Sequence, residues 1–325
     1  MNYSKVLLIV TSLSLAAGSG NHDDCWFDCM RREGRRVQAR CKPNNQQQPQ
    51  QPEEQSNYAE KYRPQIPFTP SKNWMNDPNG MVYIDGTWHL FYQYNPSGND
   101  WGNMSWGHAT SPDLIHWTEQ KVALTKDNLG DIFSGSAVCD TENTAGFGAG
   151  TMVAFYTSAG AHQQQSMAYS LDKGKSFEKF SGNPILNNSD MPDFRDPKVF
   201  WHAESRQWVM ALAKGWDYAI DFYGSTDMKK WNKLSSFAVP ESARCNKGQW
   251  ECPDLIRMEI DGQEKWVLIV SVNPGGPTSG SGTMYFVGQF NGSEFVADSR
   301  DYPLWMDYGM DNYAGVTWSN APEGR

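Results

Sequence analysis

The stretch SPDLIHW at residues 111–117 returns twice in altered form, as SLDKGKSF at residues 170–177 and as STDMKKW at residues 225–231. The three copies begin 59 and 55 residues apart. A second, apolar string has nearly the same period: TWHLFY at 87–92, TMVAFY at 151–156, QWVMAL at 207–212 and KWVLIV at 265–270. Two unrelated strings that share one period indicate a chain built from repeats.

The repeat unit is an all-β unit. Short runs rich in Val, Tyr, Phe, Trp and Met are broken by Gly, Pro, Asn and Asp, and long amphipathic helical patterns are absent. A four-stranded unit of this length that recurs in series is typical of a propeller blade, whereas a β-sandwich explains the strands but not the repeat. Four repeats begin near Asp77, Ser134, Asp196 and Glu251, and a fifth opens at Tyr313 to Ser319. The chain ends inside that fifth unit, so we expect an incomplete fifth blade.

The residues before the repeats fall into three segments. Residues 1–20 contain an apolar run followed by small residues, which predicts a secretory signal too short to span a bilayer. Residues 21–43 carry Cys25, Cys29 and Cys41, for which a local disulfide or free thiols are favoured over a redox or metal hairpin. Residues 44–62 form a Gln/Pro-rich linker, and residues 63–325 the propeller domain. We therefore expect a secreted, periplasmic or extracellular protein with no integral membrane span.

Charge and composition limit the partners. The net charge of -9, from 37 acidic and 28 basic residues without long runs, gives no footprint for nucleic acid, so a neutral substrate fits better. No histidine or cysteine set has metal-ligand spacing, and we expect no metal or cofactor. The sequence does not indicate an oligomeric state.

Carboxylates mark the same position in three repeats. Asp77, Asp196 and Glu251 each stand just before the first strand of their repeat, 11 to 15 residues ahead of the tryptophan in the apolar string. Ser134 holds the matching place in the second repeat. Equivalent positions of different blades point at one axis, so these side chains are expected to converge. Crowded carboxylates cannot all ionise, so one keeps its proton while another stays charged. That division of roles is what cleavage of a glycosidic bond requires.

Each motif alone also has an ordinary structural interpretation. Asn76 to Gly80 (NDPNG) reads as a turn, Arg195 to Pro197 (RDP) as a surface ion pair before a strand, and Glu251 to Asp254 (ECPD) as a polar turn. Their recurrence at one phase of the repeat favours a functional site.

Aromatic and amide side chains supply further candidates. Most of the 14 tryptophans stand at strand centres and are expected to pack between blades. Trp101, in a polar loop, and Trp318, in the fifth repeat, are better candidates for sugar contacts. For Gln93, a hydrogen bond to a substrate hydroxyl and a structural hydrogen bond are equally expected.

The three motifs, in the form WMNDPNG at 74–80, FRDP at 194–197 and ECPD at 251–254, resemble those of glycoside hydrolase family 32, the invertases, inulinases and levanases. The resemblance covers about residues 63 to 325. It implies a five-bladed β-propeller and a retaining mechanism. Members of this family typically complete the fifth blade and add a C-terminal β-sandwich domain, and neither is expected in this sequence. The Asp307–Ser319 and Tyr94–Pro96 segments look closer to microbial fructan hydrolases than to plant vacuolar invertases.

The resemblance also implies roles for individual residues. It makes Asp77 the nucleophile, Glu251 the general acid/base, and Asp196, beside Arg195, the group that holds ring hydroxyls and stabilises the transition state. The remaining residues that it places in substrate binding are Asn76, Asn79, Gln93, Trp101, Phe133, Ser134, Arg195 and Trp318.

The function expected from the sequence is release of fructose or fructo-oligosaccharides from levan, inulin or sucrose by double displacement. Fructosyl transfer remains an alternative, because it uses the same covalent intermediate and differs only in the acceptor. A non-catalytic fructan-binding fragment is a third hypothesis, which the incomplete fifth blade favours and the intact Asp77 and Glu251 disfavour. A propeller that acts on arabinan or xylan is disfavoured by the WMNDPNG string.

Overall fold

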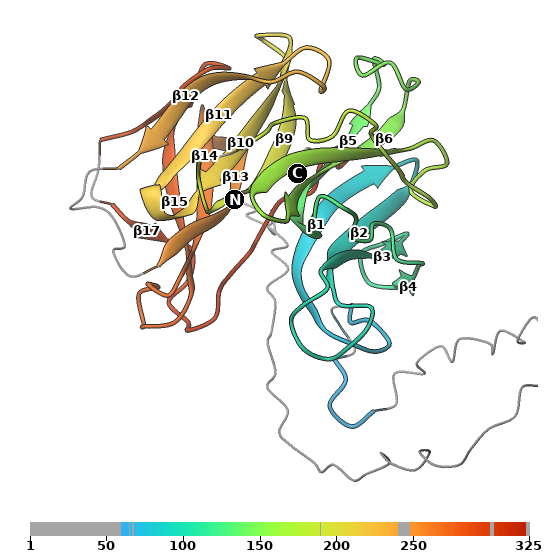
Figure 1. Ribbon diagram of the computed structural model, residues 1–325. Coiled ribbons are helices and arrows are strands. Elements are labelled where there is room, and N and C mark those ends of the chain that lie inside the picture. Colours follow the sequence, from blue (N-terminus) through green and yellow to red (C-terminus); the bar gives the residue numbers. More distant parts are fainter. Residues whose placement is uncertain are drawn as a thin grey trace, which may run out of the picture.

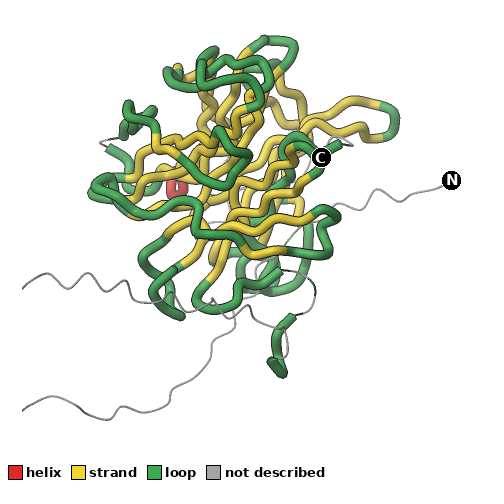
Figure 2. The backbone as a smooth tube through the Cα atoms, turned by 90° about the vertical axis from the view of Figure 1, so that its right-hand side faces the viewer, coloured by secondary structure: helices red, strands yellow, loops and turns green. Residues whose placement is uncertain are grey.

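The computed structural model describes residues 60–64, 66, 68–188, 190–239, 248–299 and 302–322. The predicted signal sequence, the cysteine segment and almost all of the predicted linker lie outside these residues. The described part is an all-β propeller of sheets arranged around one axis (Figure 1). Strands and loops make up nearly all of it (Figure 2), and its one helix is the short 3-10 turn η1 (Gly215–Asp217).

Each blade is an antiparallel meander in which consecutive strands pair in chain order. The first blade contains β1 (Met75–Ile84), β2 (Thr87–Tyr94), β3 (Ser105–Ser111) and β4 (Thr118–Glu119), and the second contains β5 (Asp131–Asp140), β6 (Thr151–Ala159), β7 (Gln163–Ser170) and β8 (Glu178–Lys179). The third contains β9 (Phe194–His202), β10 (Gln207–Lys214), β11 (Ala219–Ser225) and β12 (Asn232–Ala238). The fourth contains β13 (Gln249–Ile260), β14 (Gln263–Asn273), β15 (Gly282–Phe290) and β16 (Phe295–Ala297), with β17 (Leu304–Trp305) also paired to β15.

Both repeated strings have a structural origin. The apolar string forms the second strand of every blade, β2, β6, β10 and β14, which is buried on both faces and therefore reads as a continuous apolar run. The serine string ends the third strand, where the Oγ atoms of Ser111, Ser170 and Ser225 donate to the aspartate two residues later. Those aspartates accept backbone N–H groups of the turn that follows, so the motif fixes the turn to the fourth strand.

The hydrophobic core lies between blades rather than within them. One cluster joins Phe91 of the first blade to Ile132 and Tyr156 of the second. A second joins the second blade to the third, and a third cluster joins the third blade to the fourth. A single blade therefore cannot bury its own faces, which is why the blades appear only in series.

The prediction of a fifth blade is corrected by the structure: the described residues form four blades. The segment that was expected to open the fifth blade forms no sheet of its own. It runs from the fourth blade to the first, where Ser319 makes an isolated parallel bridge with Val82 of β1. Val316 and Trp318 pack on the face of the first blade that no other described blade covers.

Candidate active site

The first strand of every blade lies nearest the axis and is interrupted by a β-bulge at the same level. The register shifts occur between Met75 and Pro78 in β1, Ile132 and Gly135 in β5, Arg195 and Lys198 in β9, and Glu251 and Asp254 in β13. A bulge leaves a residue unpaired and re-aims its side chain. The bulges therefore explain why Asp77, Ser134 and Asp196 leave the sheet pattern and turn to a common centre.

Local sequence chemistry favours these bulges. Proline has no N–H to donate to a ladder. Pro197 and Pro253 stand inside their bulges, and Pro78 directly follows the bulge of β1. Asp196 and Cys252 adopt positive φ angles of 66° and 47°. Such angles are uncommon outside glycine and mark backbone that its surroundings hold in place.

The structure brings Asp77, Asp196 and Glu251 together through shared partners. Ser134 Oγ donates to Asp77 Oδ2 at 2.8 Å, and the Cys252 thiol approaches the same oxygen at 3.7 Å. The backbone N–H of Cys252, the residue after Glu251, donates to Asp196 Oδ2 at 2.9 Å. A small cavity on the axis is lined by residues of all four first strands, among them Pro78, Ser134 and Asp196. The convergence expected from the repeat is therefore present.

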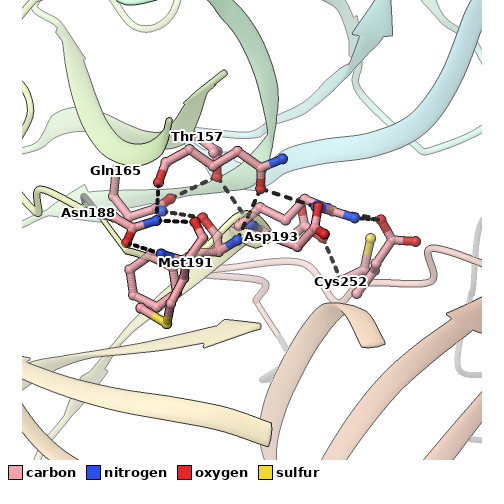
Figure 3. A network of polar contacts seen from close by, with 11 residues as sticks. Thr157, Gln165, Asn188, Met191, Asp193 and Cys252 are labelled. Carbon is pink, nitrogen blue, oxygen red and sulfur yellow. Dashed lines mark hydrogen bonds and ion pairs between the residues drawn. The ribbon is translucent and has the colours of Figure 1, made fainter. Parts of the chain in front are cut away.

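Arg195 is the one cation in contact with this group among the described residues. Its Nε and Nη2 donate to Glu251 Oε1 at 2.9 and 2.7 Å. Its Nη1 donates to Gln163 Oε1 at 3.1 Å and to Asp193 Oδ1. Figure 3 shows this polar network running from Asn188 and Asp193 to Cys252.

The electrostatics separate the carboxyl groups. Burial raises the pKa of Glu251, and Asp196 adds to the rise, while the Arg195 guanidinium opposes it; the result is a pKa of about 7. Burial also raises the pKa of Asp196, against the effect of Arg195 and the Cys252 N–H. Burial and the charges of Asp196 and Asp77 raise the pKa of the Cys252 thiol, which is therefore a neutral donor toward Asp77. A pKa of about 7 suits Glu251 to carry a proton near neutral pH.

Some predicted site residues support the carboxylates from behind. Asn76 Nδ2 donates to Asp77 Oδ1 at 3.3 Å, and Asn76 Oδ1 accepts from Trp74 Nε1 at 2.8 Å. Asn79 is fully buried, and its amide oxygen accepts from Gln93 N and Nε2 when the amide nitrogen faces Ser134 Oγ. Gln93 Nε2 also donates to Ile132 O at 3.0 Å. The structural hydrogen bond expected for Gln93 is therefore present.

The predicted aromatic residues divide. Trp101 is 58% exposed and meets the ring of Phe133, the neighbour of Ser134, edge to face at 5.9 Å. These two rings therefore stand at the rim of the site. Trp318 is buried against Trp88 and Trp117, with centroid distances of 5.1 and 6.3 Å, in the cluster on the outer face of the first blade. The structure places Trp318 with packing residues and not with the carboxylates.

Several residues of the network were not anticipated. Thr157 Oγ1 accepts from the Asp196 N–H at 3.1 Å, Asp193 accepts from Arg195, and Gln163 accepts from Arg195 and from the Phe194 N–H. Cys252 directly follows Glu251 in the ECPD motif, so the sequence could have predicted that it lies at the site. Gln163 lies in a run of three glutamines that carries no pattern pointing to the site.

In residues 60–322, apart from the gaps given above, no three His, Cys, Asp or Glu side chains are grouped to hold a metal ion. None of the helices in this part of the chain has the length and apolar character needed to cross a bilayer.

Comparisons with known proteins agree with this geometry. The model of the glycosyl hydrolases family 32 N-terminal domain matches residues 68–325. The chain is 50% identical over 275 residues to a levanase of Bacillus subtilis, covering 82% of this chain and 40% of the levanase. It is 45% identical over 302 residues to an extracellular exo-inulinase of Aspergillus niger, covering 81% of this chain and 56% of that enzyme. The chain thus spans about half the length of these relatives.

Solved structures give the same result. The crystal structure of an exo-inulinase from Aspergillus awamori matches with a TM-score of 0.76 and 42% identity, over 82% of this chain and 58% of that one. A fructofuranosidase from Schwanniomyces occidentalis, solved in complex with fructose, matches with a TM-score of 0.76 and 43% identity, over 81% of this chain and 53% of that one. The bulged carboxylate motifs, the propeller and these matches lead to one conclusion: the chain belongs to glycosyl hydrolase family 32.

Proposed function

We propose that this protein is a retaining β-fructosidase that releases fructose or fructo-oligosaccharides from levan, inulin or sucrose. The observation that carries the proposal is that Glu251, whose pKa burial raises to about 7, and Asp77 meet at one axial site. There the thiol of Cys252, the residue after Glu251, lies 3.7 Å from Asp77 Oδ2. The levanase and exo-inulinase relatives support a fructan as substrate.

In the first step, a carboxylate oxygen of Asp77 attacks the anomeric carbon, the bond to the leaving oxygen breaks, and Glu251 gives its proton to that oxygen. Glu251 Oε1 already accepts two N–H groups of Arg195, so the proton resides on Oε2. In the second step, Glu251 takes a proton from water, the water oxygen attacks the same carbon, and Asp77 leaves. Two inversions give overall retention.

Asp77 and Asp196 have different environments that suit different roles. Both oxygens of Asp77 are oriented, Oδ2 by Ser134 and Cys252 and Oδ1 by Asn76. Asp196 is held through its own N–H by Thr157 and through Oδ2 by the Cys252 N–H. Fixed negative charge beside a ketose centre stabilises the positive charge that develops there, which is the role proposed for Asp196.

An extracellular location is proposed on the strength of the predicted signal sequence and of the extracellular exo-inulinase relatives.

The test is release of fructose by the 325-residue chain from levan, inulin and sucrose, with Asp77→Asn and Glu251→Gln as matched variants. Release that disappears in both variants supports the proposal. Transfer products in place of free fructose at high sucrose would identify a fructosyltransferase. A folded chain that binds fructan and releases nothing would contradict the proposal and leave a binding function.

A further inference from the structure

A cleft of about 460 Å³ opens beside the carboxylates. It is lined by Phe133, by the hairpin from Ala159 to Gln163 that joins β6 to β7, and by Asp190 to Pro192. The volume lies within the range of about 300–1,000 Å³ that is common for small-molecule sites. The lining combines apolar surface, such as Met191 and Pro192, with the polar side chains His162 and Gln163. Such a surface suits a neutral sugar.

The cleft is on the side of Glu251. Gln163 in its wall accepts from Arg195 Nη1, and the same guanidinium donates twice to Glu251 Oε1. On the opposite wall, Phe133 precedes Ser134, the partner of Asp77. A general acid stands next to the leaving oxygen of its substrate. The sugar attached to that oxygen therefore enters this cleft.

The orientation of the Gln163 amide is determined by its partners. Its Oε1 accepts from the Phe194 N–H at 3.0 Å and from Arg195 Nη1 at 3.1 Å. Both partners are pure donors, so a reversed amide would place its NH₂ group against two N–H groups. The amide nitrogen must then be on the other side. It donates to none of the residues that the structure describes, and it is not among the buried polar atoms that lack a partner. Two N–H donors are thus directed to the cleft.

The wall that carries Gln163 is firmly held. Asn188 Nδ2 donates to Gln163 O at 2.9 Å and to Met191 O at 2.7 Å, and Asn188 Oδ1 accepts from the Asp190 and Met191 N–H groups. Asn188 and Met191 are seen side by side with their hydrogen bonds in Figure 3. Binding of a ligand to this amide therefore does not incur the entropic cost of ordering the loop.

We propose that Gln163 binds the leaving-group sugar of a fructo-oligosaccharide: its NH₂ group donates to a hydroxyl of that sugar, while its oxygen positions Arg195 on Glu251. The inference rests on the proposed β-fructosidase function and adds the side chain that recognises the unit beyond the cleaved bond.

The test compares two substrates that share the fructosyl unit and differ in the leaving group. In 1-kestose the leaving group carries further hydroxyls, whereas in methyl β-fructofuranoside it carries none beyond the leaving oxygen. Both leaving groups are alcohols, so both reactions depend on the acid. The variant Gln163→Met keeps the side-chain length and removes the donor. We expect kcat/KM for 1-kestose to fall about 3- to 10-fold more than kcat/KM for the methyl substrate, as for the loss of one neutral hydrogen bond. Gln164→Met is the matched control, because neighbouring residues of a strand face opposite sides, and it leaves the ratio unchanged.

Equal losses on both substrates would overturn the inference, because they would mean that Gln163 acts only through Arg195. Gln163→Glu separates the two roles, since a carboxylate still accepts from Arg195 and Phe194 but donates nothing. Gln163→Glu should restore the rate on the methyl substrate and still alter the substrate ratio. An unaltered ratio counts against the proposal even if the methionine variant fails to fold.

Should the wild-type chain turn over neither substrate, the proposed function fails and binding decides the inference separately. Isothermal titration of 1-kestose and of fructose into wild type and Gln163→Met then applies. Weaker binding of 1-kestose alone supports the role of Gln163, and equal affinities for wild type and variant overturn it.

Discussion

Arg195 binds Glu251 through one carboxylate oxygen only: Nε and Nη2 both donate to Oε1, at 2.9 and 2.7 Å. The second oxygen is left to hold a proton. Because burial outweighs the attraction of Arg195, the pKa of Glu251 rises to about 7 instead of falling as in an exposed ion pair.

This relationship predicts the alkaline limb of the pH profile. A general acid works only while protonated, so kcat/KM should fall as the pH rises through about 7. Arg195→Met removes the cation that lowers the pKa of Glu251. The residual kcat/KM should therefore begin to fall at a pH about 1 unit higher than in the wild type. Arg257→Met is the control. Arg257 lies on β13, the strand of Glu251, but contacts Glu204 and Glu264 at the surface. A limb that moves to lower pH in Arg195→Met would rule out Glu251 as the acid.

Two serines of β5 should differ in their effect on catalysis. Ser134 Oγ donates to Asp77 Oδ2 at 2.8 Å, whereas Ser136 Oγ donates to Pro197 O at 2.7 Å and so bridges two blades. Ser134→Ala should lower kcat about 10- to 100-fold, the loss of a hydrogen bond to a charged group, with little change in the melting temperature. Ser136→Ala should lower the melting temperature and leave kcat nearly intact. The reverse pattern, measured by steady-state kinetics and thermal melts, would show that Ser134 is structural.

The buried ion pair of Lys198 and Asp254 should hold the final segment in place. Lys198 Nζ donates to Asp254 Oδ2 at 3.0 Å, and the Thr317 N–H and Oγ donate to the same oxygen. Lys198→Met leaves a buried carboxylate without its cation and should reduce the free energy of unfolding by about 3–5 kcal/mol. Lys173→Met, which breaks the exposed pair with Asp85, should cost less than about 1 kcal/mol in the same urea titrations. Similar costs for the two variants would contradict the expected role of the buried pair.

A pair of stacked histidines should make stability depend on pH. His89 Nδ1 and His108 Nε2 are 3.1 Å apart, and burial lowers the pKa of His89 to about 4 and that of His108 to about 3. Both are neutral in the folded protein, while the unfolded chain binds protons below pH 6.5. Their contribution is therefore complete above pH 6.5 and declines as the pH falls toward 4, by about 3 kcal/mol for each histidine.

Denaturant unfolding between pH 7.5 and 4.5 measures that slope. The double variant His89→Phe/His108→Phe keeps the aromatic stacking and should lose most of the pH dependence, whereas His116→Gln, at an exposed site, should keep it. An unchanged slope in the double variant would mean that other groups titrate.

Repeats and motifs were enough to predict the blades, the second strands and the convergence of the three carboxylates. Periodicity reports which residues are equivalent, and equivalence in a propeller implies a common axis. The number of blades was predicted wrongly, because Tyr313 to Ser319 has the pattern of a first strand, but its only β pairing with the described residues is a bridge to Val82. Whether a segment forms a sheet depends on the strands available beside it, and the sequence of the segment alone does not specify those strands.

The prediction of individual contacts was less complete for a related reason. Trp318 has the side chain of a sugar platform, yet its contacts with Trp88 and Trp117 depend on which face of the first blade stays uncovered. Gln163 lacks any motif, and its place beside Arg195 follows from the hairpin between β6 and β7. Cross-blade contacts of this kind join residues far apart in sequence and leave no local pattern.

The roles of Asp77 and Glu251 are tested most directly by trapping the fructosyl-enzyme. In Glu251→Gln, an activated substrate such as p-nitrophenyl β-fructofuranoside does not need the acid for the first step, but the second step lacks its base, so the intermediate should accumulate. Mass spectrometry of the quenched protein should find one added fructosyl unit, located after digestion on the peptide that contains Asp77. Turnover with the label on another residue, or nitrophenol release without any covalent adduct, would contradict the double displacement proposed for this chain.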